Sequence, residues 1–148
     1  IKNPKRIVFC SGKIFYELDD YRKGNKIKNV KIVRLEQIYP FPFDTIGQVI
    51  LKNTDAEMLW VQEEPKNMGA WGFVKSRIRH IFSKYKLNQN LYYVGRRRAA
   101  APATGIAKRH IANQGLIKKL ALQSSIKSVI KEKTGVSFMK FKNLPSNE

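Results

Sequence analysis

The chain is poor in the residues that bind metals or carry nucleophilic and redox chemistry. Its 148 residues include one cysteine, Cys10, and two histidines, His80 and His110. A single cysteine cannot form an internal disulfide, and Cys10 ends the apolar run 7–10, so we expect it to pack in a buried strand and the protein to occupy a reducing compartment. No spacing typical of a zinc or iron site is present, and we predict no metal site.

Glycine-rich nucleotide loops and long apolar runs are also missing. Neither Gly-x-x-x-x-Gly-Lys-Ser/Thr nor Gly-x-Gly-x-x-Gly occurs, so a free-standing kinase or dehydrogenase has no support. No apolar run approaches the length that spans a bilayer, and residues 1–6 lack the apolar segment of a secretory signal. We therefore expect a soluble protein without a membrane partner. Because the chain opens with Ile1 and not methionine, we expect it to begin inside a longer protein.

Acidic residues are scarce in the second part of the chain. Residues 1–64 carry 11 Lys and Arg against 9 Asp and Glu, whereas residues 65–148 carry 18 against 2, a balance of +16. A positive field of this size attracts polyanions in general, including nucleic acid, anionic membranes and nucleotide phosphates. Lysine and asparagine are abundant throughout, so a compositional bias of the genome explains the charge equally well.

The segments that are present alternate between strand and helix patterns. Apolar runs predict strands at 7–10, 30–35, 58–61 and 91–94, and apolar residues at helical spacing predict helices over 14–24, 44–51, 71–85 and from about 105. We expect Gly24 to end the first helix, and Asp44 and Thr104 to cap the second and the last. This alternation predicts an α/β protein with a mostly parallel sheet and helices on both faces.

Polar residues follow the predicted strands, where the carboxyl ends of a parallel sheet collect functional groups. Ser11 and Gln37 follow the first two strands, and residues 62–67 and 95–105 follow the other two. Ser11 has no identifiable base partner, so we recognise no catalytic triad in the sequence.

The paired carboxylates Glu63 and Glu64 are the most conspicuous of these groups. Adjacent residues on an extended strand point to opposite faces, so the two do not converge on one substrate, and we predict no catalytic residue here. We expect Gln62, Glu63, Glu64 and Asn67 to position a loop or an interface. In that interpretation one carboxylate faces a cleft or partner, and the other meets helix amides or a basic side chain.

Three consecutive arginines, Arg96, Arg97 and Arg98, follow the last predicted strand. A planar guanidinium binds phosphate or carboxylate through two parallel hydrogen bonds, so a phosphorylated effector or an acidic partner surface is one candidate ligand. A solvated run of charge is the competing interpretation.

Four separated motifs together resemble a known family. They are Ile-Val-Phe-Cys-Ser-Gly-Lys at 7–13, Ile-Val-Arg-Leu-Glu-Gln-Ile-Tyr-Pro-Phe-Pro at 32–42, Gln-Glu-Glu-Pro-Lys-Asn-Met-Gly-Ala-Trp at 62–71, and Val-Gly-Arg at 94–96 with Ala-Ala-Pro-Ala-Thr-Gly at 100–105. In order and spacing, over residues 5–120, they resemble the C-terminal domain of the decarboxylating component of 2-oxoglutarate dehydrogenase.

The resemblance implies a transketolase C-terminal-like α/β domain over residues 1–121, with a basic extension, helical and then loose, over residues 122–148. It implies a parent enzyme that converts 2-oxoglutarate to CO₂ and delivers a succinyl group to a lipoyl-bearing acyltransferase in the citric acid cycle. The family's thiamine diphosphate signature, Gly-Asp-Gly followed by paired asparagines, is absent here. Thiamine diphosphate and Mg²⁺ are therefore expected on other domains, and this chain alone is expected to be a non-catalytic assembly and regulatory domain.

The resemblance also implies partners and a compartment. Expected partners are the other domains of the same chain, a second copy in a homodimer, the succinyltransferase component, and acetyl-CoA or an adenine nucleotide as effector at the arginine run. The family works in the mitochondrial matrix or the bacterial cytoplasm, and the composition favours the former. Arg97, Arg98 and the basic stretch after Lys108 depart from the family pattern, and His110, at a recurring family position, is expected to pack or hydrogen bond.

Two alternatives stay open. The equivalent domain of a 2-oxoadipate dehydrogenase has a similar pattern, and the substrate pocket lies elsewhere in the parent enzyme. A basic module that binds nucleic acid or another polyanion would account for the charge, but the aromatic residues lie mostly on predicted core stripes and form no stacking platform. We therefore expect nucleic acid not to be a partner.

Overall fold

Four parallel strands make the sheet in this computed structural model, which describes residues 2–96 and 107–131. The order across the sheet is β2-β1-β3-β4, and each neighbouring pair is parallel. In chain order the elements are β1 (Arg6–Cys10), α1 (Ile14–Gly24), β2 (Val30–Arg34), α2 (Phe43–Leu51), β3 (Glu57–Pro65), α3 (Trp71–Lys84), β4 (Leu91–Arg96), α4 (Ala107–Leu122) and α5 (Ile126–Lys131). The predicted α/β class with helices on both faces is confirmed.

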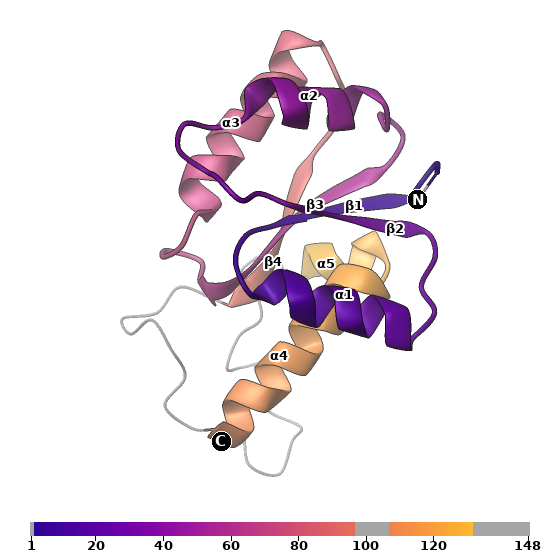
Figure 1. Cartoon of the computed structure of the whole chain (residues 1–148), viewed down its shortest axis with the longest axis vertical. Coiled ribbons are helices and arrows are strands. Elements are labelled where there is room, and N and C mark those ends of the chain that lie inside the picture. The colour runs from indigo at the N-terminus through magenta and orange to yellow at the C-terminus, as the bar shows by residue number, and fades with distance from the viewer. Residues whose placement is uncertain (1, 97–106, 132–148) are drawn as a thin grey trace.

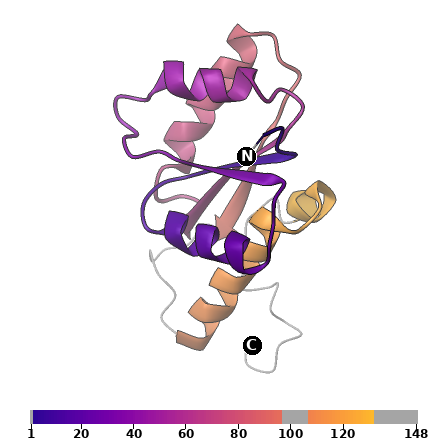
Figure 2. The same ribbon diagram turned by 45° about the vertical axis from the view of Figure 1, so that its right-hand side comes forward.

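The apolar strands are buried on both faces because helices cover both sides of the sheet. Along β1, Ile7 and Phe9 pack in one cluster with α2 and α3, whereas Val8 and Cys10 pack in the other with α1, α4 and α5. Figure 1 shows these two helical layers, and Figure 2 shows the same layers after rotation. Alternate residues of a strand point to opposite faces, so a continuous apolar run serves both clusters.

Cys10 is fully buried, as its place in an apolar strand predicts. Burial raises the pKa of its thiol to about 12, against a small opposing effect of Arg34. A thiol in this environment stays protonated at neutral pH, so Cys10 packs as a small apolar side chain.

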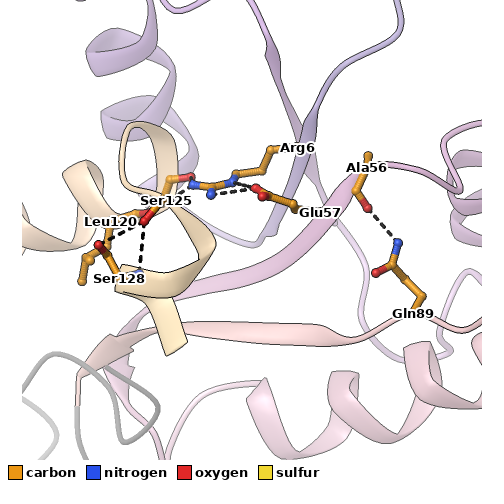
Figure 3. A network of polar contacts seen from close by, with 8 residues as sticks. Arg6, Ala56, Glu57, Gln89, Leu120, Ser125 and Ser128 are labelled. Carbon is orange, nitrogen blue, oxygen red and sulfur yellow. Dashed lines mark hydrogen bonds and ion pairs between the residues drawn. The ribbon is translucent and has the colours of Figure 1, made fainter. Parts of the chain in front are cut away.

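Arg6 joins the amino end of the sheet to the end of α4. Its guanidinium donates to Glu57 at 2.8 Å and to the carbonyl oxygens of Leu120 and Ala121 at 3.2 and 3.0 Å. Figure 3 shows Arg6 between Glu57 and the α4 end, with the separate contact from Gln89 to the carbonyl of Ala56 nearby. A cation at the carboxyl end of a helix satisfies the last carbonyls and complements the helix dipole.

The predicted capping role of Asp44 is wrong. Helix α2 begins one residue earlier, with Pro42 at the capping position, and Asp44 lies in the first turn without a side-chain capping bond. Proline suits this position because its fixed φ is compatible with a helix start and it has no N–H to satisfy. Asp44 still carries its negative charge near the positive end of the helix dipole.

The two last strands extend further than their apolar runs. β3 continues from Val61 to Pro65, and β4 continues from Val94 to Arg96, where Pro65 and Arg96 lie opposite each other after an irregular register. The polar residues at the ends of these strands thus belong to the strands. The apolar runs alone predict that the two strands end earlier, at Val61 and Val94.

The described part of the predicted extension packs on the same core. Leu122 and Val129 are 3% and 1% exposed and belong to the cluster that α1 and α4 cover. Thr104, Gly105 and residues 132–148 lie outside the described residues. None of the helices within those residues combines the length and apolarity that a membrane span requires.

Candidate functional site at the carboxyl edge of the sheet

Gln62 is the centre of the first polar network at the carboxyl edge. Its side chain is buried, its Oε1 accepts from the Trp60 indole at 2.9 Å and the Trp71 amide at 3.0 Å, and its Nε2 donates to three carbonyls. These carbonyls belong to Glu64, Pro65 and Met68, at 3.1, 3.0 and 2.8 Å. One side chain therefore connects β3, the following turn and the first residue of α3.

The turn between β3 and α3 requires glycine at position 69. Gly69 has φ of +67°, and a Cβ there would lie 3.1 Å from the Cβ of Glu64 and 3.2 Å from Gln62 Oε1. The turn closes with a hydrogen bond from the Met68 amide to the Pro65 carbonyl at 2.8 Å. A residue with a side chain would be strained in backbone and crowded by Gln62 and Glu64.

Gln114 is the centre of a second network, which joins four elements. From α4, its Nε2 donates to Glu63 on β3 at 3.0 Å and to Glu17 on α1 at 3.3 Å. Its Oε1 accepts from Arg96 on β4 at 2.8 Å, and Arg96 also donates to the Glu63 carbonyl at 2.8 Å. Gln114 and Arg96 are both 7% exposed.

The charges of this network are only partly balanced. Burial, and then the nearby carboxylate of Glu17, raise the pKa of Glu63 above its ordinary value, although Lys13 and Arg96 oppose the shift. Burial also lowers the pKa of the Arg96 guanidinium. Burial, reinforced by the carboxylate of Glu17, therefore leaves Glu63 easier to protonate than a solvated glutamate.

Tyr93 lies beside both networks and shapes the end of β4. Its hydroxyl donates to the Arg96 carbonyl at 2.7 Å, and its ring centroid lies 5.1 Å from that of Trp71. Burial raises the pKa of this hydroxyl well above its ordinary value. A Cβ at Gly95 would collide with the Tyr93 hydroxyl and with the Gln62 carbonyl, which explains the glycine.

The predicted site residues divide among these environments. Gln62, Glu63 and Arg96 lie in the networks. Glu64 is exposed with its side chain beside Gly69, and Asn67 is exposed and lines a cavity. Arg97 and Arg98 lie outside the described residues, as does the side chain of His110. The binding and positioning roles given to these residues stay predictions.

Sequence reasoning missed Gln114 and Glu17. Gln114 falls on the buried stripe of α4 at helical spacing from Ile117 and Ala121, and Glu17 lies next to buried Leu18 on α1. A polar residue on an otherwise apolar stripe indicates a buried hydrogen-bond partner. That signal was available, but it does not say which residue is the partner.

The network can hold elements together and can take up a proton at Glu63. No three His, Cys, Asp or Glu side chains gather as metal ligands in the part of the chain that the structure describes. Its donors and acceptors are engaged mainly with one another, which favours a role in fixing the geometry of this edge.

Comparison with known proteins gives consistent matches. A family profile described as 2-oxoglutarate dehydrogenase C-terminal matches residues 1–122. The 2-oxoglutarate dehydrogenase E1 component of Brucella anthropi is 43% identical over 112 residues, which are 73% of this chain and 11% of the relative. Proteins of the same name from Brucella ovis and Brucella canis match equally well. The chain spans 11% of the length of these curated relatives.

Proposed function

Because the chain belongs to the 2-oxoglutarate dehydrogenase C-terminal family, we propose that it is the C-terminal domain of an E1 component that decarboxylates 2-oxoglutarate. The observation that carries this proposal is the match over residues 1–122, together with 43% identity to E1 components. The full enzyme would pass the resulting succinyl group to a lipoyl-bearing succinyltransferase in the citric acid cycle.

The chain itself would contribute assembly and positioning, and no catalytic group. Within the described residues no three His, Cys, Asp or Glu side chains gather as ligands for Mg²⁺, and the sequence lacks the thiamine diphosphate signature of the family it resembles. We assign both to domains outside this chain. Gln62 would hold the turn at 65–71 against the neighbouring domain or the second subunit of a homodimer, with Glu63, Glu64 and Asn67 beside it.

An assay of the full-length protein tests the activity. With thiamine diphosphate, Mg²⁺ and an artificial electron acceptor, we expect turnover of 2-oxoglutarate at a kcat/KM well above that for 2-oxoadipate. The reverse preference would assign the chain to a 2-oxoadipate dehydrogenase. Turnover of neither substrate would overturn the proposal.

A regulatory role at the arginine run is a separate proposal. Arg97 and Arg98 would bind the phosphates of acetyl-CoA or an adenine nucleotide, whereas the preceding Arg96 is held in the buried network. Replacing Arg96 would disturb Gln114 and Glu63, so the sharper test replaces only Arg97 and Arg98 by alanine in the full-length enzyme. Calorimetry should then show weaker effector binding, and unchanged affinity would contradict the role.

For the compartment, we propose the bacterial cytoplasm. The named relatives come from Brucella, a bacterium, which favours the bacterial cytoplasm over the mitochondrial matrix that composition favours. Sequencing the region upstream of Ile1 tests this, since a mitochondrial enzyme would carry an Arg-rich, acid-poor transit peptide there.

A further inference from the structure

One edge strand of the sheet, β4, lies beside a groove that shares Trp71 and Tyr93 with the site described above. β4 is the last strand in the sheet order, and among the described residues it pairs only with β3. A cavity of about 460 Å³ lies along this edge. We call it the β4 groove, and its lining residues are Lys66, Trp71, Lys75, Arg79, Asn90, Leu91, Tyr92, Tyr93 and Val129.

The β4 groove is positively charged. Lys66, Lys75 and Arg79 line it, and none of the lining residues within the described part of the chain is acidic. A second cavity of about 420 Å³ shares Lys66, Trp71 and Lys75 and continues along the turn before α3. The sequence has no Asp or Glu between Glu64 and Glu132, so this surface gains no neighbouring carboxylate from that stretch.

Aromatic rings hold two of these cations at the groove. The Lys66 ammonium lies 5.2 Å from the centre of the Tyr93 ring, and the Lys75 ammonium lies 5.6 Å from that of Trp71. Lys75 and Arg79 are four residues apart on α3, so they project from the same side of the helix. Lys66 after β3 and Lys75 and Arg79 on α3 thus line the same groove.

An extended strand is the shape that matches this arrangement. The free edge of a β-strand presents backbone donors and acceptors that another strand can pair with, and alternate side chains of that strand point to one face. Four consecutive residues, 90–93, line the groove along the strand direction. A nucleic acid could use the charges but has no backbone that pairs with a strand edge.

We propose that the β4 groove docks an extended acidic segment of another protein chain, which adds to the edge of β4 and places its carboxylates against Lys66, Lys75 and Arg79. Main-chain pairing would supply the orientation, and charge complementarity would select acidic segments over basic ones. This inference does not depend on the proposed oxidoreductase activity.

Binding of a labelled peptide to the full-length protein tests it. The probe is a fluorescent peptide of alternating glutamate and valine, followed by anisotropy. The double variant Lys75→Glu/Arg79→Glu should weaken binding by about tenfold or more, because two attractive pairs become repulsive. The matched control Lys28→Glu/Lys84→Glu makes the same change in net charge at exposed positions outside the groove, and should change the affinity by less than about twofold.

A second peptide separates strand addition from simple charge attraction. Replacing each valine by proline keeps the charge but removes the strand's ability to pair, so binding should be lost and the backbone amides of residues 90–93 should gain no protection from hydrogen exchange. Equal binding of both peptides would overturn the proposal. So would no binding of the valine peptide, equal losses in the two charge variants, or tighter binding of single-stranded oligothymidylate than of the peptide.

Discussion

Gln62 uses both ends of its side-chain amide in the turn that follows β3. Its oxygen accepts from Trp60 and Trp71, and its nitrogen donates to three carbonyls of the turn. The sequence places a glutamine between an apolar strand and a glycine-containing turn, which predicts a positioning residue. It does not predict that five separate groups hydrogen bond to this side chain, because those contacts depend on the path that the turn takes in the folded protein.

At the residue scale, replacing Gln62 by leucine should destabilise the domain strongly. The change leaves buried donors and acceptors unsatisfied, at a cost of about 3 kcal/mol in free energy of unfolding. Urea denaturation of the full-length protein and of the variant measures the difference. Gln48→Leu makes the same chemical change on an exposed face of α2 and should stay within about 0.5 kcal/mol of the parent.

The raised pKa of Glu63 predicts that the stability of the domain depends on pH. Its pKa is raised in the folded protein, so the folded state binds a proton more readily than the unfolded state. At low pH Glu63 is protonated in both states and does not lower the free energy of unfolding. The free energy of unfolding falls as the pH rises from 4.5, the ordinary pKa of glutamate, through the raised pKa of Glu63 in the folded protein. At pH values above this window, the free energy of unfolding no longer changes with the ionisation of Glu63.

The variant Glu63→Gln removes the ionisation and keeps an oxygen that can accept from Gln114. Relative to the parent it should gain stability as pH rises through the window above pH 4.5, and the gain should level off at higher pH. Denaturant midpoints measured across this range test the sign. A gain that is larger at low pH than at high pH would contradict the assignment.

Among the helices, α4 is held at its middle and at its carboxyl end by polar contacts from other elements. Gln114, in the middle of the helix, connects it to β3 and α1, and Arg6 on β1 donates to the carbonyls of Leu120 and Ala121 at its end. The helix pattern in the sequence predicts the element. Neither attachment follows from that pattern, because the partners lie far away in the chain.

Replacing Arg6 by methionine should therefore loosen α4 and destabilise the fold. The change leaves Glu57 without its ion pair and two carbonyls without their donor, at a cost of about 2–3 kcal/mol. Chemical denaturation gives the stability, and hydrogen exchange of the α4 amides shows where the loss falls. Lys5→Met removes a neighbouring exposed cation and should have little effect, and equal losses in the two variants would contradict this role of Arg6.

At the scale of the whole molecule, the described end of the chain belongs to the same core as the sheet. Val129 on α5 is 1% exposed and packs with residues of β1, β3 and β4. The sequence places this segment in a separate extension after residue 121, because lysines dominate it and the family resemblance ends near residue 120.

Val129→Ala should accordingly behave as a core substitution. Removing the two methyl groups from a closed cluster should lower the free energy of unfolding by about 2 kcal/mol. Lys127→Ala, at an exposed position of the same helix, should change it by less than about 0.5 kcal/mol. A thermal or urea transition that is the same for both variants would show that α5 adds nothing to the core.

The class of fold and the family can both be predicted from local patterns in the amino-acid sequence. Alternation of apolar runs and helical stripes is a local property, so residues 7–10 and 58–61 predict buried strands without knowledge of their neighbours. The four motifs keep their order and spacing along the chain, and the match over residues 1–122 agrees with them.

The hydrogen-bond partners of the polar residues at the strand ends depend on the folded arrangement of the elements. Glu63 and Gln114 are 51 residues apart, and Arg6 and Ala121 are 115 apart, yet each pair is hydrogen bonded. Such contacts depend on strand order and on the path of α4 across the sheet, which no local pattern contains. The same dependence makes β4 the last strand of the sheet among the described residues, beside the α3 cations Lys75 and Arg79 that line the same groove.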